Sequence, residues 1–286
     1  MMKGEWKRSV KHVKQPRNPR RLVVKVGTST LTRETGSLNL QNMEHLARVL
    51  ADLEGMGYQP VLVSSGAIGI GTKKLRLGER PTELRMKQAA AAVGQCRMMH
   101  IYDKLFAEYN RTVAQILLTG EDVESPVRSE HLHNTFEALL ELGVIPVVNE
   151  NDSVSSAEIE TGQCKVLGDN DTLSAIVARL CGAGLLVLFS DIDGLYDADP
   201  RTHPDARLIH QVEAITPELR AMAGGAGTWR GTGGMATKLN AAQVAMDAGI
   251  DMVIANGQNM EAIYDIVSGR DVGTRFAAPA GAKGGN

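Results

Sequence analysis

The 286-residue sequence contains few cysteines and few aromatic residues, and it has no long hydrophobic run. Its three cysteines, Cys96, Cys164 and Cys181, are widely spaced and form no CxxC motif, which argues against a disulfide scaffold and a zinc ribbon. No segment approaches the roughly 20 apolar residues of a membrane helix, and the N-terminus lacks the apolar core of a secretory signal. We therefore expect a cytoplasmic protein without membrane association.

The sequence also lacks a strong excess of charge of either sign, because 31 Lys and Arg residues face 33 Asp and Glu residues. A formal net charge of −2 does not favour a nucleic-acid partner. Hydrophobic residues make up 43% and aromatic residues only 4%, so the core must consist mainly of Val, Ile, Leu, Ala and Met. Such a core is typical of α/β sheets covered by helices.

The two ends of the chain differ in composition from the rest. Residues 1–21 carry eight basic side chains against one acid, contain Pro16 and Pro19, and show no periodicity, so we expect a flexible basic arm. A mitochondrial presequence is a second possibility, although the prolines would interrupt its amphipathic helix. Residues 277–286 are rich in Gly, Ala and Pro and are expected to form a flexible tail. The folded domain is therefore expected over residues 22–276.

Within this domain, short apolar runs of strand length alternate with longer segments of helical periodicity. Strands are expected at residues 22–26, 60–64, 113–118, 144–148, 185–189 and 252–255. Helices are expected at residues 40–56, 82–109, 129–142, 172–180, 216–222, 234–248 and 259–268. Residues 154–168 interrupt the alternation and are expected to contain a small hairpin. This order predicts a doubly wound α/β sandwich with parallel strands.

The residues that follow the strands are informative, because ligands bind outside the carboxyl ends of strands in such sheets. Gly27 and Gly66 each follow a strand beside small hydroxyl residues, a pattern that exposes backbone N–H groups to an anion such as phosphate. Lys25 lies within an apolar strand, where an ammonium group is costly unless a ligand or a carboxylate compensates it. The alternative is an extended lysine paired with a structural acid.

A glycine-rich segment at residues 231–238, GTGGMATK, opens an expected helix. Backbone N–H groups at the helix start, together with Lys238, favour a polyphosphate ligand. Gly231, Gly233 and Ala236 also match the dinucleotide pattern GxGxxG/A, but they follow a loop and not a strand, which argues against nicotinamide binding. A purely structural glycine loop remains an alternative.

Two clusters of amides and acids complete the set of candidate residues. One cluster follows the fourth strand and the other begins a helix, and their members are Asn149, Asn151, Asp152, Asp169, Asn170 and Asp171. Such groups can hold an ammonium, orient lysines or bind Mg²⁺ near phosphates, whereas helix capping would explain only one acid. His131 and His133 would face different sides of a helix, so no metal site is expected there. Lysines, glycine turns and acidic loops at one sheet edge indicate phosphoryl transfer.

The motifs that carry these residues resemble those of the amino acid kinase family. In chain order they are VVKVGTS, SSGAI, VVNENDSV, LGDNDTLSA, SDIDGLYDADPR and GTGGMATK, and the similarity extends from about Leu22 to Phe276. The resemblance implies a three-layer αβα sandwich with a mainly parallel central sheet. It also implies an enzyme that uses ATP and Mg²⁺. The NEND and GDND loops are most similar to members that phosphorylate the γ-carboxylate of L-glutamate, the first step of proline biosynthesis. A carboxylate is already a nucleophile, so in-line transfer would need no general base.

The matching motifs imply a role for individual residues. Lys25 and Lys238 would flank the transferred phosphoryl group, and Asp171 would orient both lysines. The residues expected to hold L-glutamate are Ser65, Asn149, Asp152, Asp169 and Asn170. The residues expected to contact ATP are Gly27, Gly66, Ser190, Asp191, Thr232, Gly233, Gly234, Met235, Ala236, Thr237 and Lys238.

The resemblance further implies a homo-oligomer, a dimer or a tetramer, and functional coupling to a glutamyl phosphate reductase. Many relatives continue into a C-terminal PUA domain. This sequence stops soon after Phe276, so we expect no RNA contact. Two alternatives remain. One is another kinase of the family, acting on acetylglutamate, aspartate, carbamate or uridylate, and the other is a catalytically silent sensor of a nucleotide or an amino acid.

Overall fold

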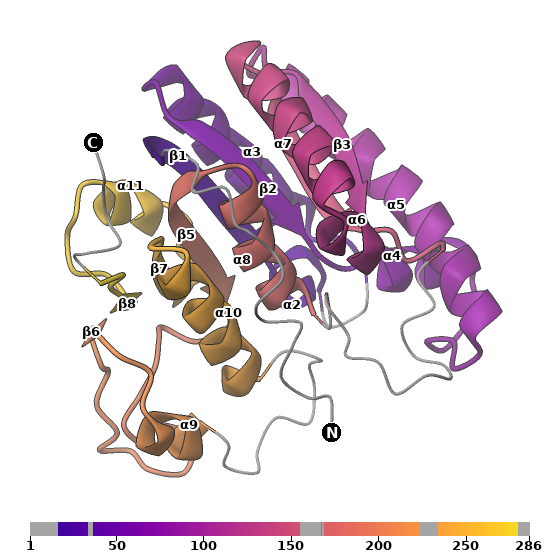
Figure 1. Ribbon diagram of the computed structural model, residues 1–286. Helices are drawn as coiled ribbons and strands as arrows, with labels where there is room; N and C mark the ends of the chain where they lie inside the picture. The colour runs from indigo at the N-terminus through magenta and orange to yellow at the C-terminus, as the bar shows by residue number, and fades with distance from the viewer. Residues whose placement is uncertain (1–16, 34–36, 155–166, 168, 224–233, 280–286) are drawn as a thin grey trace, which may run out of the picture.

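The computed structural model describes residues 17–33, 37–154, 167, 169–223 and 234–279 (Figure 1). Its strands are β1 (Asn18–Val26), β2 (Gln59–Ser64), β3 (Val113–Leu118), β4 (Ile145–Glu150), β5 (Ala183–Ser190), β6 (Gln211–Val212), β7 (Asp251–Asn256) and β8 (Thr274–Phe276). Its helices are α2 (Thr28–Leu31), α3 (Leu40–Gly55), α4 (Ala67–Lys74), α5 (Leu84–Ala107), α6 (Gly120–Glu124), α7 (Pro126–Glu141), α8 (Asn170–Leu180), α9 (Pro217–Ala223), α10 (Met235–Asp247) and α11 (Ala262–Val267).

The strands form an eight-stranded sheet in the order β3-β4-β2-β1-β5-β7-β8-β6. The pairings between described strands are parallel except that between β7 and β8. β1 lies between β2 and β5, with Lys25 opposite Val63 on one side and Leu188 on the other. The carboxyl ends of these three strands are therefore level with one another. The expected α/β sandwich with a mainly parallel sheet is confirmed.

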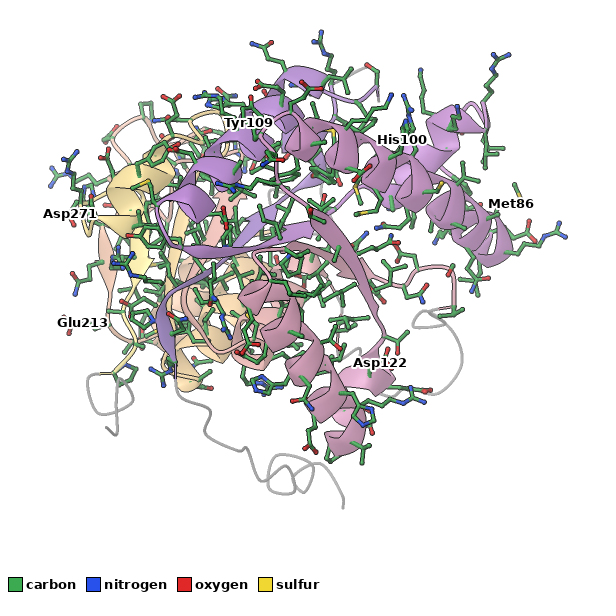
Figure 2. The ribbon with its side chains drawn as sticks, turned by 90° about the horizontal axis from the view of Figure 1, so that it is seen from above. Met86, His100, Tyr109, Asp122, Glu213 and Asp271 are labelled. Atoms are coloured by element: carbon green, nitrogen blue, oxygen red, sulfur yellow. The ribbon has the colours of Figure 1, made fainter. Side chains whose placement is uncertain are left out.

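Helices cover both faces of the sheet. In Figure 2, α5 with Met86 and His100 lies on one side of the sheet, and α6 with Asp122 lies on the other. Alternate residues of β1 enter different cores: Val24 packs in the core beneath α3, α5 and α11, whereas Val23 packs in the core beneath α7, α8 and α10. Because side chains alternate along a strand, Lys25 faces the same layer as Val23. The pleat thus directs this lysine toward α8 and α10.

The ends of the domain differ from the sequence-based expectation. β1 begins at Asn18, so residues 18–21 belong to the sheet and not to the basic arm, whose residues 1–16 lie outside the described part. Arg21 is buried because it pairs with Glu137 and donates to the carbonyl of Cys181. At the other end, the backbone N–H of Ala277 donates to Val212 O at 2.9 Å. The flexible tail was expected to begin at residue 277, but Ala277 is still hydrogen-bonded to the sheet.

Several short elements were not predicted, namely α2, α4, α6, β6 and β8, and each has eight residues or fewer. The expected helix at 129–142 begins at Pro126, where Ser125 accepts a hydrogen bond from the N–H of Arg128 at 3.5 Å. A hydroxyl N-cap followed by proline is a common helix start. The expected hairpin at 154–168 lies almost entirely outside the described residues. In the described part of the chain, no helix is long and apolar enough to cross a membrane.

Candidate active site

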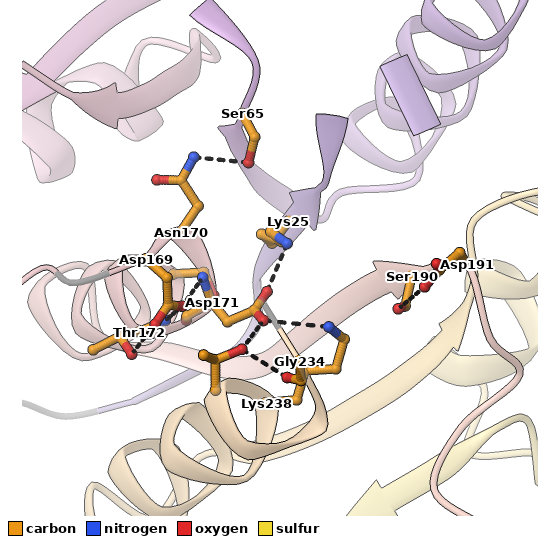
Figure 3. Close-up of polar contacts among 12 residues, drawn as sticks. Lys25, Ser65, Asp169, Asn170, Asp171, Thr172, Ser190, Asp191, Gly234 and Lys238 are labelled. Atoms are coloured by element: carbon orange, nitrogen blue, oxygen red, sulfur yellow. Dashed lines mark hydrogen bonds and ion pairs between the residues drawn. The ribbon is translucent and has the colours of Figure 1, made fainter. Parts of the chain in front are cut away.

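Two lysines and one aspartate meet beyond the carboxyl end of β1 (Figure 3). The Nζ atom of Lys25 lies 2.6 Å from Asp171 Oδ1, and the Nζ atom of Lys238 lies 3.4 Å from Asp171 Oδ2. The hydroxyl of Thr237 donates to the same Oδ2 at 2.8 Å. We call Lys25, Asp171 and Lys238 the lysine centre. It brings together the three residues for which a catalytic role was predicted.

The lysine centre is deeply buried and carries an excess positive charge. Exposed fractions are 9% for Lys25, 6% for Lys238 and 1% for Asp171. Burial alone would raise the pKa of the Asp171 carboxyl, but the ammonium groups of Lys25 and Lys238 outweigh burial and hold this pKa below its usual range. The carboxylate stays ionised, and two cations share one anion. A buried site with one surplus positive charge suits a ligand with several negative charges.

Local structure fixes each member of the lysine centre. Asp171 lies in the first turn of α8, whose N-cap is Asp169: Asp169 Oδ1 accepts the backbone N–H groups of Asp171 and Thr172 at 2.8 and 2.9 Å. Lys238 lies in the first turn of α10, after the N-cap residue Gly234. Asp169, predicted to hold a substrate, therefore caps a helix here and orients its neighbour Asp171.

A chain of polar side chains leads away from the lysine centre. Asn170 Nδ2 donates to Ser65 Oγ at 2.7 Å and to Asn149 Oδ1 at 3.2 Å. Asn149 Nδ2 in turn donates to Gln95 Oε1 at 3.0 Å. Ser65, Asn149 and Asn170 were predicted from the sequence to act together, whereas Gln95 was not. Gln95 lies within the long helix α5, where nothing in the helical pattern distinguishes it.

A pocket of about 190 Å³ lies at the far end of this chain. Its lining includes Gln95, Glu150 and Asp152, and we call it the acidic pocket. Burial, and then the charge of Glu150, raise the pKa of Asp152 to about 6, against a smaller opposing effect of Arg80. A cation bound beside Asp152 would stabilise the ionised form of its carboxyl group.

The residues predicted to contact a nucleotide occupy several places. Gly66 adopts φ +101°, a conformation that favours glycine, and caps α4. Gly27 is extended, and a β-carbon there would lie 3.6 Å from Lys25 Nζ. The hydroxyl of Ser190 donates to Asp191 at 3.1 Å at the end of β5, apart from the lysine centre (Figure 3). Gly234 is the N-cap of α10, Met235 and Ala236 begin this helix, and Thr232 and Gly233 lie outside the described residues.

Asp171 is surrounded by neighbouring protein groups. Its Oδ1 is ion-paired to Lys25, and its Oδ2 contacts Lys238 and the Thr237 hydroxyl. Across the residues that the structure describes, no group of three or more His, Cys, Asp or Glu side chains could hold a metal ion.

Comparison with known proteins defines the class to which this fold and site belong. Residues 20–256 match the amino acid kinase family, so the chain belongs to this family. The glutamate 5-kinase of Clostridium perfringens is 55% identical over 265 residues, which cover 93% of this chain and 98% of that protein. The glutamate 5-kinase of Listeria innocua is 51% identical over 262 residues, which cover 92% and 94% of the two chains.

Solved structures agree with the fold. The UMP kinase from Bacillus anthracis superimposes with a TM-score of 0.62 at 18% identity and covers 93% of this chain and 98% of its own. The isopentenyl phosphate kinase from T. acidophilum gives a TM-score of 0.60 at 16% identity, with 90% and 99% covered. At such low identity these structures support the architecture alone.

Proposed function

We propose that this protein transfers the γ-phosphoryl group of ATP to the γ-carboxylate of L-glutamate, forming L-glutamyl 5-phosphate and ADP in the first step of proline biosynthesis. The observation that carries the proposal is the buried lysine centre beside a chain of hydrogen-bonded side chains, which starts at Asn170, the sequence neighbour of Asp171, and leads to a pocket lined by acids. Membership of the amino acid kinase family and the high identity to two glutamate 5-kinases support both the reaction and the acceptor.

The lysine centre would stabilise charge that develops during transfer. The substrate carboxylate attacks the γ-phosphorus in line, the bond to the β,γ-bridging oxygen breaks, and the bridging oxygen leaves with ADP. Lys25 would stabilise charge on the acceptor side and Lys238, at the start of α10, on the nucleotide side. At an effective dielectric constant near 20, one charge about 4 Å from another is worth roughly 4 kcal/mol. Asp171 does not touch the phosphoryl group in this scheme; it holds both lysines in position.

The acidic pocket would recognise the amino-acid part of L-glutamate. Asp152 has a raised pKa because it is buried beside Glu150, and the substrate ammonium would supply the missing positive charge. Ser65, Asn149 and Asn170 lie between this pocket and the lysine centre. The substrate would therefore lie along the polar chain, with its γ-carboxylate toward the lysines.

ATP would lie on the side of Gly234 to Lys238, Ser190 and Asp191. Asp171 is ion-paired to both lysines, and we propose that Mg²⁺ is held mainly by the phosphates of ATP and by water. A cytoplasmic location suits an enzyme that consumes ATP. Acyl phosphates hydrolyse readily, so a glutamyl phosphate reductase would have to consume the product promptly. A homo-oligomer, dimer or tetramer, is part of the same proposal.

The test is ADP release from MgATP with L-glutamate, in parallel with acetylglutamate, aspartate, carbamate and UMP. Hydroxylamine is included to trap any acyl phosphate as a hydroxamate. We expect hydroxamate and ADP in equal amounts with L-glutamate. ADP formed only with another acceptor would keep the phosphoryl-transfer chemistry and overturn the substrate assignment. Tight ligand binding with no turnover would instead support a sensor.

A further inference from the structure

Gln95 is a buried polar residue that sequence analysis did not single out. Only 7% of the residue is exposed, and its Oε1 accepts from Asn149. Its Nε2 atom is buried and has no hydrogen-bond partner among the described residues. A buried amide without a partner is costly, so such groups in native proteins call for an explanation.

The amide orientations of Gln95 and its neighbours are mutually consistent. Asn170 donates to Asn149 Oδ1, and Asn149 Nδ2 donates to Gln95 Oε1. This arrangement leaves both N–H donors of Gln95 Nε2 to serve another group. The residue lines the acidic pocket, where a ligand would meet these donors.

The backbone around Gln95 is held rigidly against the segment that follows Ser65. A β-carbon on Gly94 would lie 1.8 Å from Ala67 O, and one on Gly71 would lie 1.7 Å from Ala90 O. Helices α4 and α5 therefore cross with their backbones in direct contact. The crossing fixes Gln95 relative to Gly66 and Ser65.

The charges around the acidic pocket indicate which group needs these donors. Glu150 and Asp152 suit a substrate ammonium but repel a carboxylate, and no residue among those that line the pocket in the described structure carries a positive charge. An α-amino acid presents an ammonium and a carboxylate on the same carbon. A neutral donor in the same pocket can bind the carboxylate without losing the acids that bind the ammonium.

We propose that Gln95 binds the α-carboxylate of the amino-acid substrate through its Nε2 donors, while its Oε1 holds Asn149 in place. This assignment rests on the proposed function, because it assumes an α-amino-acid acceptor whose γ-carboxylate lies at the lysine centre. Gln95 would thus select for the head group of the substrate and would take no part in phosphoryl transfer itself.

Two variants separate these contributions. Gln95→Glu keeps an oxygen for Asn149 and removes the donor, and Gln95→Met removes both without adding charge. A lost hydrogen bond to a charged group is worth about a 10- to 100-fold change in affinity. We expect both variants to raise the KM for L-glutamate by about this factor, with the KM for MgATP within twofold of wild type. Gln88→Met, on the same helix and outside the pocket lining, is the matched control and should leave all constants unchanged.

Binding can be measured without turnover, because Cys96 is exposed and lines the same pocket. Alkylation of the peptide that contains Cys96, quantified by mass spectrometry, should be slowed by L-glutamate in the wild type and in Gln88→Met. It should require about 10- to 100-fold more L-glutamate in both Gln95 variants.

An unchanged KM for L-glutamate in Gln95→Met would overturn the assignment. An increase in this KM confined to Gln95→Glu would also overturn it, because the effect would then come from the added negative charge. A parallel rise in both substrate constants with a loss of thermal stability would reduce Gln95 to a structural residue. Failure of the proposed function looks different: the wild type itself would give no hydroxamate with L-glutamate. The same variants would then be assayed with the acceptor that it does use.

Discussion

The lysine centre and the acidic pocket lie at the same edge of the sheet, but the carboxylates of buried Asp171 and half-buried Asp152 have opposite environments. Asp171 is held by two ammonium groups and a hydroxyl, and its pKa is lowered. Asp152 lies near Glu150, and its pKa is raised to about 6. The first carboxylate is ion-paired to two lysines, whereas the second has only the weaker effect of Arg80. In the proposed mechanism, Asp171 would organise the catalytic groups and Asp152 would meet a cationic group of the substrate.

The largest effect is expected from the cations of the lysine centre. Lys25→Ala and Lys238→Ala should each lower kcat roughly 10³-fold, because each removes about 4 kcal/mol of charge stabilisation at the phosphoryl group. Hydroxamate formation gives kcat, and denaturant unfolding gives the accompanying change in stability. Lys104→Ala, an exposed lysine of α5, is the control. An unchanged kcat in Lys25→Ala or in Lys238→Ala would remove the substituted lysine from the mechanism.

Asp171→Asn should destabilise the fold and also lower kcat, because it leaves two buried lysines without their carboxylate. Breaking a buried ion pair from one side costs about 3 to 5 kcal/mol. The lowered pKa of Asp171 means that its stabilising contribution is present above the unfolded-state pKa and is lost as the pH falls through the folded-state value. Urea unfolding at pH 7 measures the loss of stability, and the difference between wild type and variant should shrink only when the pH falls below the ordinary pKa value of 3.8. Hydroxamate formation measures kcat. A variant as stable as the wild type would contradict the pairing.

Asp152→Asn should have the opposite effect on stability while it weakens substrate binding. A pKa of about 6 against the ordinary 3.8 means that the ionised carboxylate costs up to about 3 kcal/mol at pH 7. The neutral variant should therefore unfold at a higher denaturant concentration at pH 7, with the gain lost below the unfolded-state pKa. Its KM for L-glutamate should rise about 100-fold, because the ammonium loses its counter-charge. A rise in the KM for ATP alone would contradict the assignment.

The sequence predicted the lysine centre because its members follow a strand or begin a helix, and the carboxyl ends of parallel strands meet at one edge. The same logic placed Ser65, Asn149 and Asp152 together. It could not find Gln95, whose contribution depends on the close crossing of α4 and α5 at Gly71 and Gly94.

The start of β1 illustrates a second limit of sequence analysis. Arg21 belongs to a basic stretch that looks like a solvated arm, yet it is buried because Glu137 lies opposite it in the fold. β8 is three residues long and is held in place by β7 and β6. Local pattern predicts elements that bury a periodic face, but not elements whose stability comes from partners distant in sequence.

The smallest expected effect is a pH dependence of the wild-type protein, which tests the contrast between Asp171 and Asp152. Only the ionised form of Asp152 offers a counter-charge to the substrate ammonium, so the KM for L-glutamate should rise as the pH falls through about 6. For a single group this amounts to about a tenfold increase between pH 7 and pH 5. The KM for MgATP, measured at the same pH values, controls for titration of the nucleotide. In Asp152→Asn the glutamate KM should be high and nearly independent of pH across this range. A wild-type glutamate KM that stays flat from pH 7 to pH 5 would mean that Asp152 is not the group that meets the ammonium, and the distinction between the two carboxylates would then rest on Asp171 alone.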